Sequence, residues 1–262
     1  MRKALKLFAV IALVAVIGFS FAACDTGGDN SGGGDGWLGN TITITDAQVY
    51  SFERDTSAQY VKFTGTVQDL KYIFFYNYDD DDHYRIYQPL SDFIDGNPSV
   101  TLKNGILNMT IGKPKNSSLL NLGDMPSGIT VSTTNVKYFS IDSIYDQSII
   151  NSDTYNVSQG KLDGTQISYV LYFYVDKDVN ITGKFADIDD GYTYINNYAM
   201  NLKAGWNSVI ITEKQTETYT YQRTYKTGTP PAGFHWVISQ GEGGNSDGGG
   251  GGGSNGGDGD GR

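Results

Sequence analysis

The 262-residue sequence contains one cysteine, two histidines and few glutamates. A single cysteine excludes an intramolecular disulfide framework and a multi-cysteine metal site. His83 and His235 do not have a metal-binding spacing such as H-E-x-x-H. No window shows the long apolar stripe of an amphipathic helix, so a largely helical fold is also excluded.

Basic residues are also scarce. The chain has 19 Lys and Arg residues against 29 Asp and Glu residues, a net charge of −10. Arg2, Lys3 and Lys6 lie in a segment that we expect to be removed, and the remaining chain then has a net charge of −13. Because nucleic acids require a basic binding face, this charge argues against a nucleic-acid partner.

The amino terminus has the pattern of an export signal. The basic residues precede an apolar run, Leu7–Gly18, and small residues follow at Ala22 and Ala23. This order predicts a secretory signal peptide over residues 1–23. The alternative is a transmembrane anchor, but the apolar stretch Leu7–Ala23 is at the lower limit of spanning length.

The single cysteine directly follows this segment. Phe21-Ala22-Ala23-Cys24 resembles the lipobox of bacterial lipoproteins, in which the cysteine becomes the lipid-modified first residue of the mature chain. Phe21 departs from the usual leucine. The resemblance implies that Cys24 carries the lipid and that the protein contacts a membrane through it. Residues 24–36, rich in Gly, Ser and Asp, are predicted to form a flexible tether.

Between Trp37 and Gln240 the dominant pattern has a period of two residues, which is typical of β-strands. Aromatic or β-branched runs alternate with turn residues every 8–12 residues or so, which predicts an all-β fold, an antiparallel β-sandwich. The expected strands are Thr41–Thr45, Tyr60–Val67, Leu70–Tyr78, Ser99–Leu102, Ile106–Ile111, Val136–Ile141, Ile167–Val175, Val179–Phe185, Tyr192–Leu202, Trp206–Glu213, Glu217–Tyr225 and Phe234–Ser239.

Some strands are apolar on both faces. Tyr169, Leu171, Phe173 and Val175 alternate with Val170, Tyr172 and Tyr174. A strand with only one buried face does not have this pattern, so we expect a central strand with a second layer over its outer face, or a strand at a contact between domains.

Three short segments each resemble a segment 87–100 residues farther along the chain, and the three pairs occur in the same order. This internal similarity leaves two domain arrangements open. One has two tandem β modules, residues 37–127 and 128–240. The other is a single sandwich over residues 37–240. Residues 241–262, almost entirely Gly, Ser, Asn and Asp, cannot bury apolar surface and are predicted to be a disordered tail.

The combination of a relaxed lipobox, a Gly/Asp/Ser tether and a β-rich body resembles spirochaete (treponemal-type) lipoproteins of uncharacterised function. The residues that carry the resemblance are Phe21–Cys24, the tether to Gly36, Thr41–Ala47 and the turn Asn201–Asn207. The resemblance implies a cell-envelope location, on the periplasmic side or at the outer surface, and a β architecture. It does not imply an activity.

No motif supports a catalytic residue, a cofactor or a metal site. Gly244–Gly248 matches the G-x-S-x-G pattern of hydrolases but has neither the preceding strand nor the following helix. Asp79–Asp82 is a dense acidic run for which calcium binding stays open beside the simpler interpretation of a solvated turn. Asp176–Asp187 copies part of an EF-hand loop, but it has Ile181 where the loop requires glycine.

The aromatic residues provide the candidate ligand site. Tyr219, Tyr221 and Tyr225 share one face of an expected strand with Arg223. Such a face is able to bind sugars or proteins, and a cross-strand tyrosine ladder that only stabilises the sheet is the alternative. Trp206 and Trp236 are predicted core residues, whereas Trp37 borders the tether.

The sequence therefore predicts a lipid-anchored envelope protein whose non-enzymatic β-sandwich body has a binding or surface-display role. A glycan-binding module is the first alternative, and a hydrolase that uses Asp carboxylates is the second.

Overall fold

The structure is a computed structural model, and it describes residues 35–53, 59–68, 70–77, 84–123, 125–146, 153–163, 166–189 and 191–242. Cys24, the acidic run Asp79–Asp82, His83 and the G-x-S-x-G match at residues 244–248 lie outside these residues.

Strands make up most of the described chain, and two short helical segments interrupt them. The helical segments are α1 (Leu90–Phe93) and the 3-10 turn Asn116–Ser118. The strands before residue 132 are β1 (Trp37–Gly39), β2 (Ile42–Glu53), β3 (Gln59–Lys62), β4 (Tyr72–Asn77), β5 (Tyr84–Pro89), β6 (Ser99–Lys103), β7 (Ile106–Ile111), β8 (Leu120–Asn121) and β9 (Ile129–Val131).

The longest strands belong to the second half of the chain. These later strands are β10 (Lys137–Ile141), β11 (Ser143–Tyr145), β12 (Asp153–Asp163), β13 (Gln166–Val175), β14 (Val179–Asp189), β15 (Tyr192–Leu202), β16 (Gly205–Glu217), β17 (Thr220–Thr227) and β18 (His235–Glu242).

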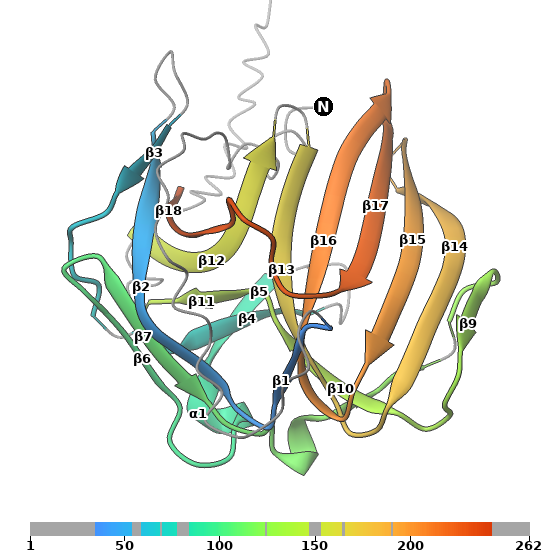
Figure 1. Ribbon diagram of the computed structural model, residues 1–262, viewed down its shortest axis with the longest axis horizontal. Coiled ribbons are helices and arrows are strands. Elements are labelled where there is room, and N and C mark those ends of the chain that lie inside the picture. Colours follow the sequence, from blue (N-terminus) through green and yellow to red (C-terminus); the bar gives the residue numbers. More distant parts are fainter. Residues whose placement is uncertain are drawn as a thin grey trace, which may run out of the picture.

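These strands form a large mixed sheet that is not closed into a barrel, which confirms the all-β prediction. Most pairs are antiparallel, but β15–β17 and β18–β2 are parallel. In Figure 1, β16, β17, β15, β14 and β9 lie on the right, whereas β2, β7 and β6 lie on the left.

β12 and β13 form a hairpin whose strands separate with distance from the turn, and β10 and β11 pair with the separated parts. Near the hairpin turn, β12 pairs directly with β13, from Gly160↔Tyr169 up to the turn. Farther from the turn, β10 pairs with β13 and β11 pairs with β12. β16 pairs with β13 along its whole length on the other side, so β13 is a central strand.

Two hydrophobic cores lie on opposite faces of β13. The larger core contains Val170, Tyr172 and Tyr174, and the smaller core contains Phe173 and Val175. Because each core covers one face of β13, the prediction that this strand is buried on both faces is confirmed.

The larger core is built around two tryptophans. Trp206 is completely buried and Trp236 is 7% exposed, so both predicted core tryptophans are confirmed. The Trp206 indole donates a hydrogen bond to the Gly112 carbonyl at 2.9 Å and packs edge-on against Tyr174 and Phe139. The other buried residues of the larger core include Ile42, Val49, Leu70, Leu90, Ile94, Leu102, Leu107, Ile111, Ile141, Val157 and Ile238.

Strands from both sides of residue 127 meet in this core. β4 pairs with β11, and β2 pairs with β18. The division into two modules at residues 127 and 128 stays a prediction.

Several strands differ from those expected, and three of the differences have a local reason. The predicted strand Glu217–Tyr225 is wrong at its start, because Tyr219 has a left-handed φ of 61° and the chain turns there. β12 was not expected, since its sequence is largely polar and only Val157 and Leu162 provide buried apolar side chains. β18 runs to Glu242, two residues into the predicted tail, because β12 continues beside it.

Candidate functional site

The predicted ligand residues lie on β17 and in the turn that precedes it. Tyr221, Arg223 and Tyr225 alternate along β17, so their side chains are on one face of the sheet. Tyr219 lies in the turn, is 58% exposed and contacts Tyr192 edge-on, with ring centroids 5.4 Å apart.

The parallel pairing of β17 with β15 places a second set of tyrosines beside the first. Tyr194 is aligned with Tyr221 and Tyr198 with Tyr225. Because aligned residues on neighbouring strands have side chains on the same face, these four rings form one surface. We call this surface, with Tyr192, Tyr219 and Arg223 added, the tyrosine face.

Ring stacking organises the tyrosine face. The Tyr198 and Tyr225 rings are stacked with centroids 4.4 Å apart and planes 7° apart. Tyr194 and Tyr221 are stacked at 5.7 Å, and Tyr192 adjoins Tyr221 at 6.1 Å. The Tyr225 hydroxyl donates a hydrogen bond to the Asn196 amide oxygen at 3.4 Å, and Tyr198 and Tyr225 pack against the smaller core, whereas Tyr219 at the end of the row is the most exposed of these tyrosines.

Arg223 is held at the centre of this surface by two contacts. Its guanidinium carbon is 4.0 Å from the Tyr194 ring centroid, a cation–π geometry. Its Nε donates a hydrogen bond to the Glu213 carboxylate on β16, and the Arg223 and Glu213 side chains are 26% and 7% exposed. Burial alone would lower the pKa of Arg223, but the hydrogen bond and charge of Glu213 outweigh it and raise the pKa.

The phenols around this pair remain neutral at physiological pH. Burial raises the pKa of Tyr198, Tyr225 and Tyr169, because the phenolate form loses its hydration. The same cause raises the pKa of Tyr221. The site is therefore rich in hydroxyl groups, and its one internal positive charge is paired with a buried carboxylate.

Sequence reasoning missed Tyr194, Tyr198 and Glu213. Alternation in Tyr192–Leu202 placed the first two on a common strand face, but no local pattern indicated that β15 would pair in parallel with β17. Glu213 stands in the polar second half of β16, Thr212–Glu217, so no local pattern distinguished it, although it is 6% exposed.

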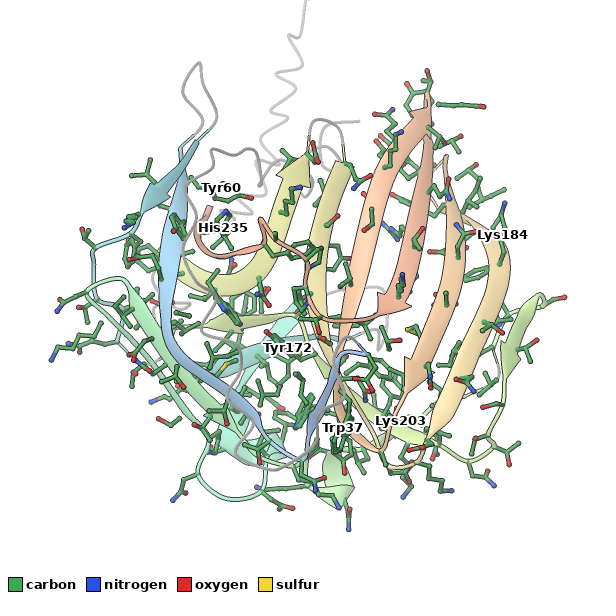
Figure 2. All side chains as sticks on the ribbon, viewed as in Figure 1. Trp37, Tyr60, Tyr172, Lys184, Lys203 and His235 are labelled. Atoms are coloured by element: carbon green, nitrogen blue, oxygen red, sulfur yellow. The ribbon has the colours of Figure 1, made fainter. Side chains whose placement is uncertain are left out.

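A second aromatic cluster contains His235. The His235 ring centroid is 4.7 Å from that of Tyr50 and 4.8 Å from that of Tyr60 (Figure 2). Burial lowers the pKa of His235. The imidazole is therefore neutral at pH 7.

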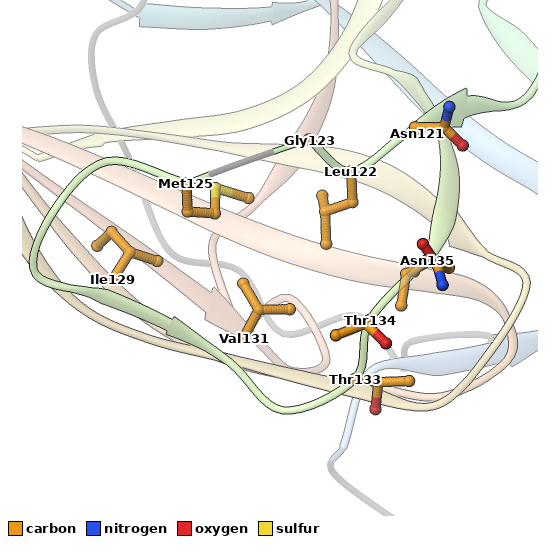
Figure 3. A pocket seen from close by; sticks show the side chains of 10 residues that line it. Asn121, Leu122, Gly123, Met125, Ile129, Val131, Thr133, Thr134 and Asn135 are labelled. Atoms are coloured by element: carbon orange, nitrogen blue, oxygen red, sulfur yellow. The ribbon is translucent and has the colours of Figure 1, made fainter.

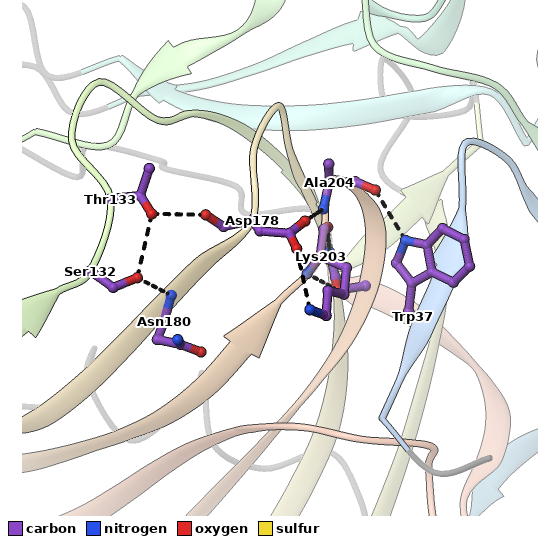
Figure 4. Close-up of polar contacts among 8 residues, drawn as sticks. Trp37, Ser132, Thr133, Asp178, Asn180, Lys203 and Ala204 are labelled. Carbon is purple, nitrogen blue, oxygen red and sulfur yellow. Dashed lines mark hydrogen bonds and ion pairs between the residues drawn. The ribbon is translucent and has the colours of Figure 1, made fainter. Parts of the chain in front are cut away.

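Asp178 of the partial EF-hand pattern makes structural contacts. Asp178 accepts hydrogen bonds from the Ala204 N–H at 2.8 Å and from the Lys203 ammonium at 3.2 Å (Figure 4). The Ala204 carbonyl in turn accepts a hydrogen bond from the Trp37 indole, whose residue is 41% exposed. Among the described residues, no group of three or more His, Cys, Asp and Glu side chains has an arrangement suited to a metal ion.

No family model, curated protein or solved structure matches the chain. In the part of the chain that the structure describes, no helix is long and apolar enough to span a membrane.

Proposed function

We propose that this chain is a lipid-anchored protein of the cell envelope whose body binds a carbohydrate through the tyrosine face and performs no catalysis. The observation that carries the proposal is the alignment of Tyr194 with Tyr221 and of Tyr198 with Tyr225 around Arg223. The anchor is supported by the signal-like segment 1–23 and by Cys24 directly after Ala22-Ala23.

The chemistry of the surface favours a neutral, polyhydroxylated ligand. Phenol groups both donate and accept hydrogen bonds, as sugar hydroxyls do. Glu213 already pairs with Arg223, so an anionic ligand would find the positive charge compensated. The exposed ring of Tyr219 is available for stacking on a sugar.

The buried carboxylates support binding over catalysis. A glycosidase uses two carboxyl groups that face each other across the scissile bond. Glu213 and Asp146 are the buried carboxylates among the described residues, and each has a structural partner: Glu213 bonds to Arg223, and Asp146 accepts a hydrogen bond from the Tyr155 N–H.

A glycan array tests the ligand proposal. The chain from residue 24 with Cys24→Ser keeps every described residue and carries no lipid. We expect it to bind neutral glycans, and Tyr219→Ala or Tyr221→Ala to weaken that binding at least tenfold. Gln222→Ala, on the opposite face of β17, is the matched control and should bind as the parent does. Absence of binding across the array, or equal binding by all variants, would contradict the proposal.

The anchor has a separate test. Cys24→Ser should release the protein from the membrane fraction and from the detergent phase in phase partitioning. Unchanged partitioning would show that Cys24 does not carry the anchor.

A further inference from the structure

The described part of the chain begins near one end of the long strand β16. The Gly36 carbonyl accepts a hydrogen bond from the Ser208 N–H at 2.7 Å, and β1 then pairs with the first residues of β16 (Figure 1). Ser208 is three residues from the start of β16 at Gly205 and nine from its end at Glu217. At a rise of about 3.3 Å per residue, Gly36 is therefore about 10 Å from one end of this strand and about 30 Å from the other.

Two exposed apolar side chains flank the nearer end of the sheet. Strand pairing places β8, β10, β13, β16 and β1 side by side in this order. Leu120 on β8 and Trp37 on β1 are 56% and 41% exposed. Four strand spacings of about 4.8 Å separate these two strands, a distance of about 19 Å.

Both side chains are on the same face of the sheet. Leu120 is aligned with Tyr138 on β10. Trp37 is aligned with Asn207 on β16, which is aligned with Phe173 on β13. The Tyr138 and Phe173 rings are stacked on the face of the smaller core, with centroids 5.2 Å apart. Because aligned residues have side chains on the same face, Trp37 and Leu120 both lie on that face.

Hydrogen bonds fix the backbone that carries these two side chains. The Trp37 indole N–H donates to the Ala204 carbonyl at 3.0 Å (Figure 4). Directly after β8, the Leu122 N–H donates to the Val136 carbonyl at 2.8 Å, which holds β8 against β10 (Figure 3). The structure therefore presents an indole and an isobutyl group at fixed positions along this end of the sheet.

We call residues 35–37, 120, 137, 176–178, 203 and 204 the entry end, and its charges balance. Its charged side chains are Asp35, Lys137, Asp176, Lys177, Asp178 and Lys203, three of each sign. The entry end has no net charge, whereas the chain from residue 24 has a net charge of −13. The opposite end of the same strands carries the exposed carboxylates Asp187 and Glu217.

We propose that the entry end rests on the phospholipid surface to which Cys24 is anchored, with Trp37 and Leu120 in the interface between headgroups and acyl chains. The inference rests on the proposed lipid anchor at Cys24. Aromatic side chains such as indole are favoured at this interface, and exposed apolar groups gain by leaving water there. A surface without net charge approaches zwitterionic headgroups without electrostatic repulsion.

The length of chain before the described residues favours this end over the opposite one. Eleven residues, 24–34, connect Cys24 to Asp35. A flexible Gly-rich chain of this length has an end-to-end distance of about 18 Å. It therefore covers the 10 Å or so that separate Gly36 from the entry end, whereas the opposite end requires a span of about 30 Å, close to full extension.

This orientation places the exposed end of the tyrosine face away from the bilayer. Tyr219 follows the last residue of β16, and Gly205 at the other end of that strand adjoins Ala204 of the entry end. The thirteen residues of β16 span about 40 Å. The proposed carbohydrate site is then presented toward a ligand outside the membrane.

The test couples the chain from residue 24, through its single cysteine, to a maleimide phospholipid in phosphatidylcholine vesicles that contain 5-doxyl phosphatidylcholine. The difference between this chain and its Trp37→Phe variant isolates the fluorescence of Trp37, because Trp206 and Trp236 are buried. We expect the doxyl lipid to quench Trp37 at least twofold. The coupling supplies the anchor chemically, so this result does not depend on lipidation in the cell, which the partitioning of Cys24→Ser tests separately.

Anchoring the body at its opposite end is the first control. Thr218 is exposed in the turn that follows β16. When the variant Cys24→Ser/Thr218→Cys is coupled to the same vesicles, Trp37 should not be quenched, because the entry end then lies about 40 Å from the bilayer.

A matched pair of charge substitutions tests the contact itself in the chain coupled at Cys24. Leu120→Glu should reduce the quenching of Trp37 at least twofold, because it places a carboxylate in the bilayer interface. Ile188→Glu is the control, because Ile188 is 76% exposed near the opposite end of β14 and its replacement should leave the quenching unchanged. Equal quenching from the two anchor positions, or unchanged quenching in Leu120→Glu, would overturn the proposal.

Discussion

The larger core and the tyrosine face are both rich in aromatic residues on alternating strands, yet the protein uses those residues differently. In the larger core, strands from both halves of the chain cover Trp206 and Tyr174, which are 0% and 3% exposed. On the tyrosine face, Tyr194, Tyr198 and Tyr225 remain half-buried and Tyr219 is largely exposed. Alternation therefore assigns residues to a face, whereas long-range topology decides whether that face is covered.

This difference implies different roles for the two regions. A covered aromatic residue contributes mainly to stability through packing. An aromatic residue on an open face contributes less to stability and is available to a ligand. The following variants test the distinction, from the largest expected effect on stability to the smallest.

Trp206→Ala removes the centre of the larger core. We expect the free energy of unfolding to fall by about 3–5 kcal/mol, because the substitution leaves a cavity and strands the Gly112 carbonyl without its donor. Chemical denaturation with urea measures the change. A loss below about 1 kcal/mol would mean that Trp206 is not packed as described.

Glu213→Gln tests the charged centre of the tyrosine face. We expect a loss of about 2 kcal/mol, since the half-buried Arg223 guanidinium loses its anionic partner. Glu217→Gln on the same strand is the control, because Glu217 is exposed and its replacement should change stability by less than about 0.5 kcal/mol. Equal effects of the two substitutions would contradict the pairing of Glu213 with Arg223.

A double-mutant cycle on Tyr198 and Tyr225 measures the stacking itself. Replacing each by leucine, singly and together, should give a coupling energy of about 0.5–1.5 kcal/mol. The coupling energy contains only the interaction between the two rings, without the transfer and cavity terms of a core truncation, so it should be smaller than the loss at Trp206. A coupling energy near zero would show that the two rings do not stabilise each other.

His235 should make stability depend weakly on pH. Its pKa is lowered in the folded state by burial beside Tyr50 and Tyr60, so the unfolded state binds more protons once the pH falls toward the ordinary value of 6.5. Stability is therefore complete above pH 6.5 and declines as the pH falls through the folded pKa. His235→Gln should reduce the difference between the urea midpoints of unfolding measured at pH 7.5 and pH 5.5. An unchanged difference would show that other titratable groups cause the pH dependence.

The sequence predicted the features that depend on neighbouring residues. Alternation in Tyr169–Val175 indicated burial on both faces, and Val170 and Val175 are both fully buried. Tyr221, Arg223 and Tyr225 were expected on a common face, and β17 places them there.

The features that the sequence did not reveal depend on distant partners or on one backbone angle. The parallel alignment of β15 with β17 brings Tyr194 and Tyr198 to the site, and nothing within either strand specifies that partner. The left-handed φ of Tyr219 moves it from the strand into the turn, although tyrosine is uncommon in this conformation.

The central claim is that the tyrosine face serves binding rather than stability, and one pair of variants tests it most directly. Calorimetry should give the dissociation constant for a neutral oligosaccharide selected on the array, and denaturation of the same samples should give the free energy of unfolding. For Tyr194→Ala/Tyr221→Ala we predict at least tenfold weaker binding with a stability loss below that of Trp206→Ala, and for Gln222→Ala/Thr224→Ala no change in binding. Unchanged affinity in Tyr194→Ala/Tyr221→Ala, together with a stability loss as large as that of Trp206→Ala, would show that the tyrosine face is a structural ladder.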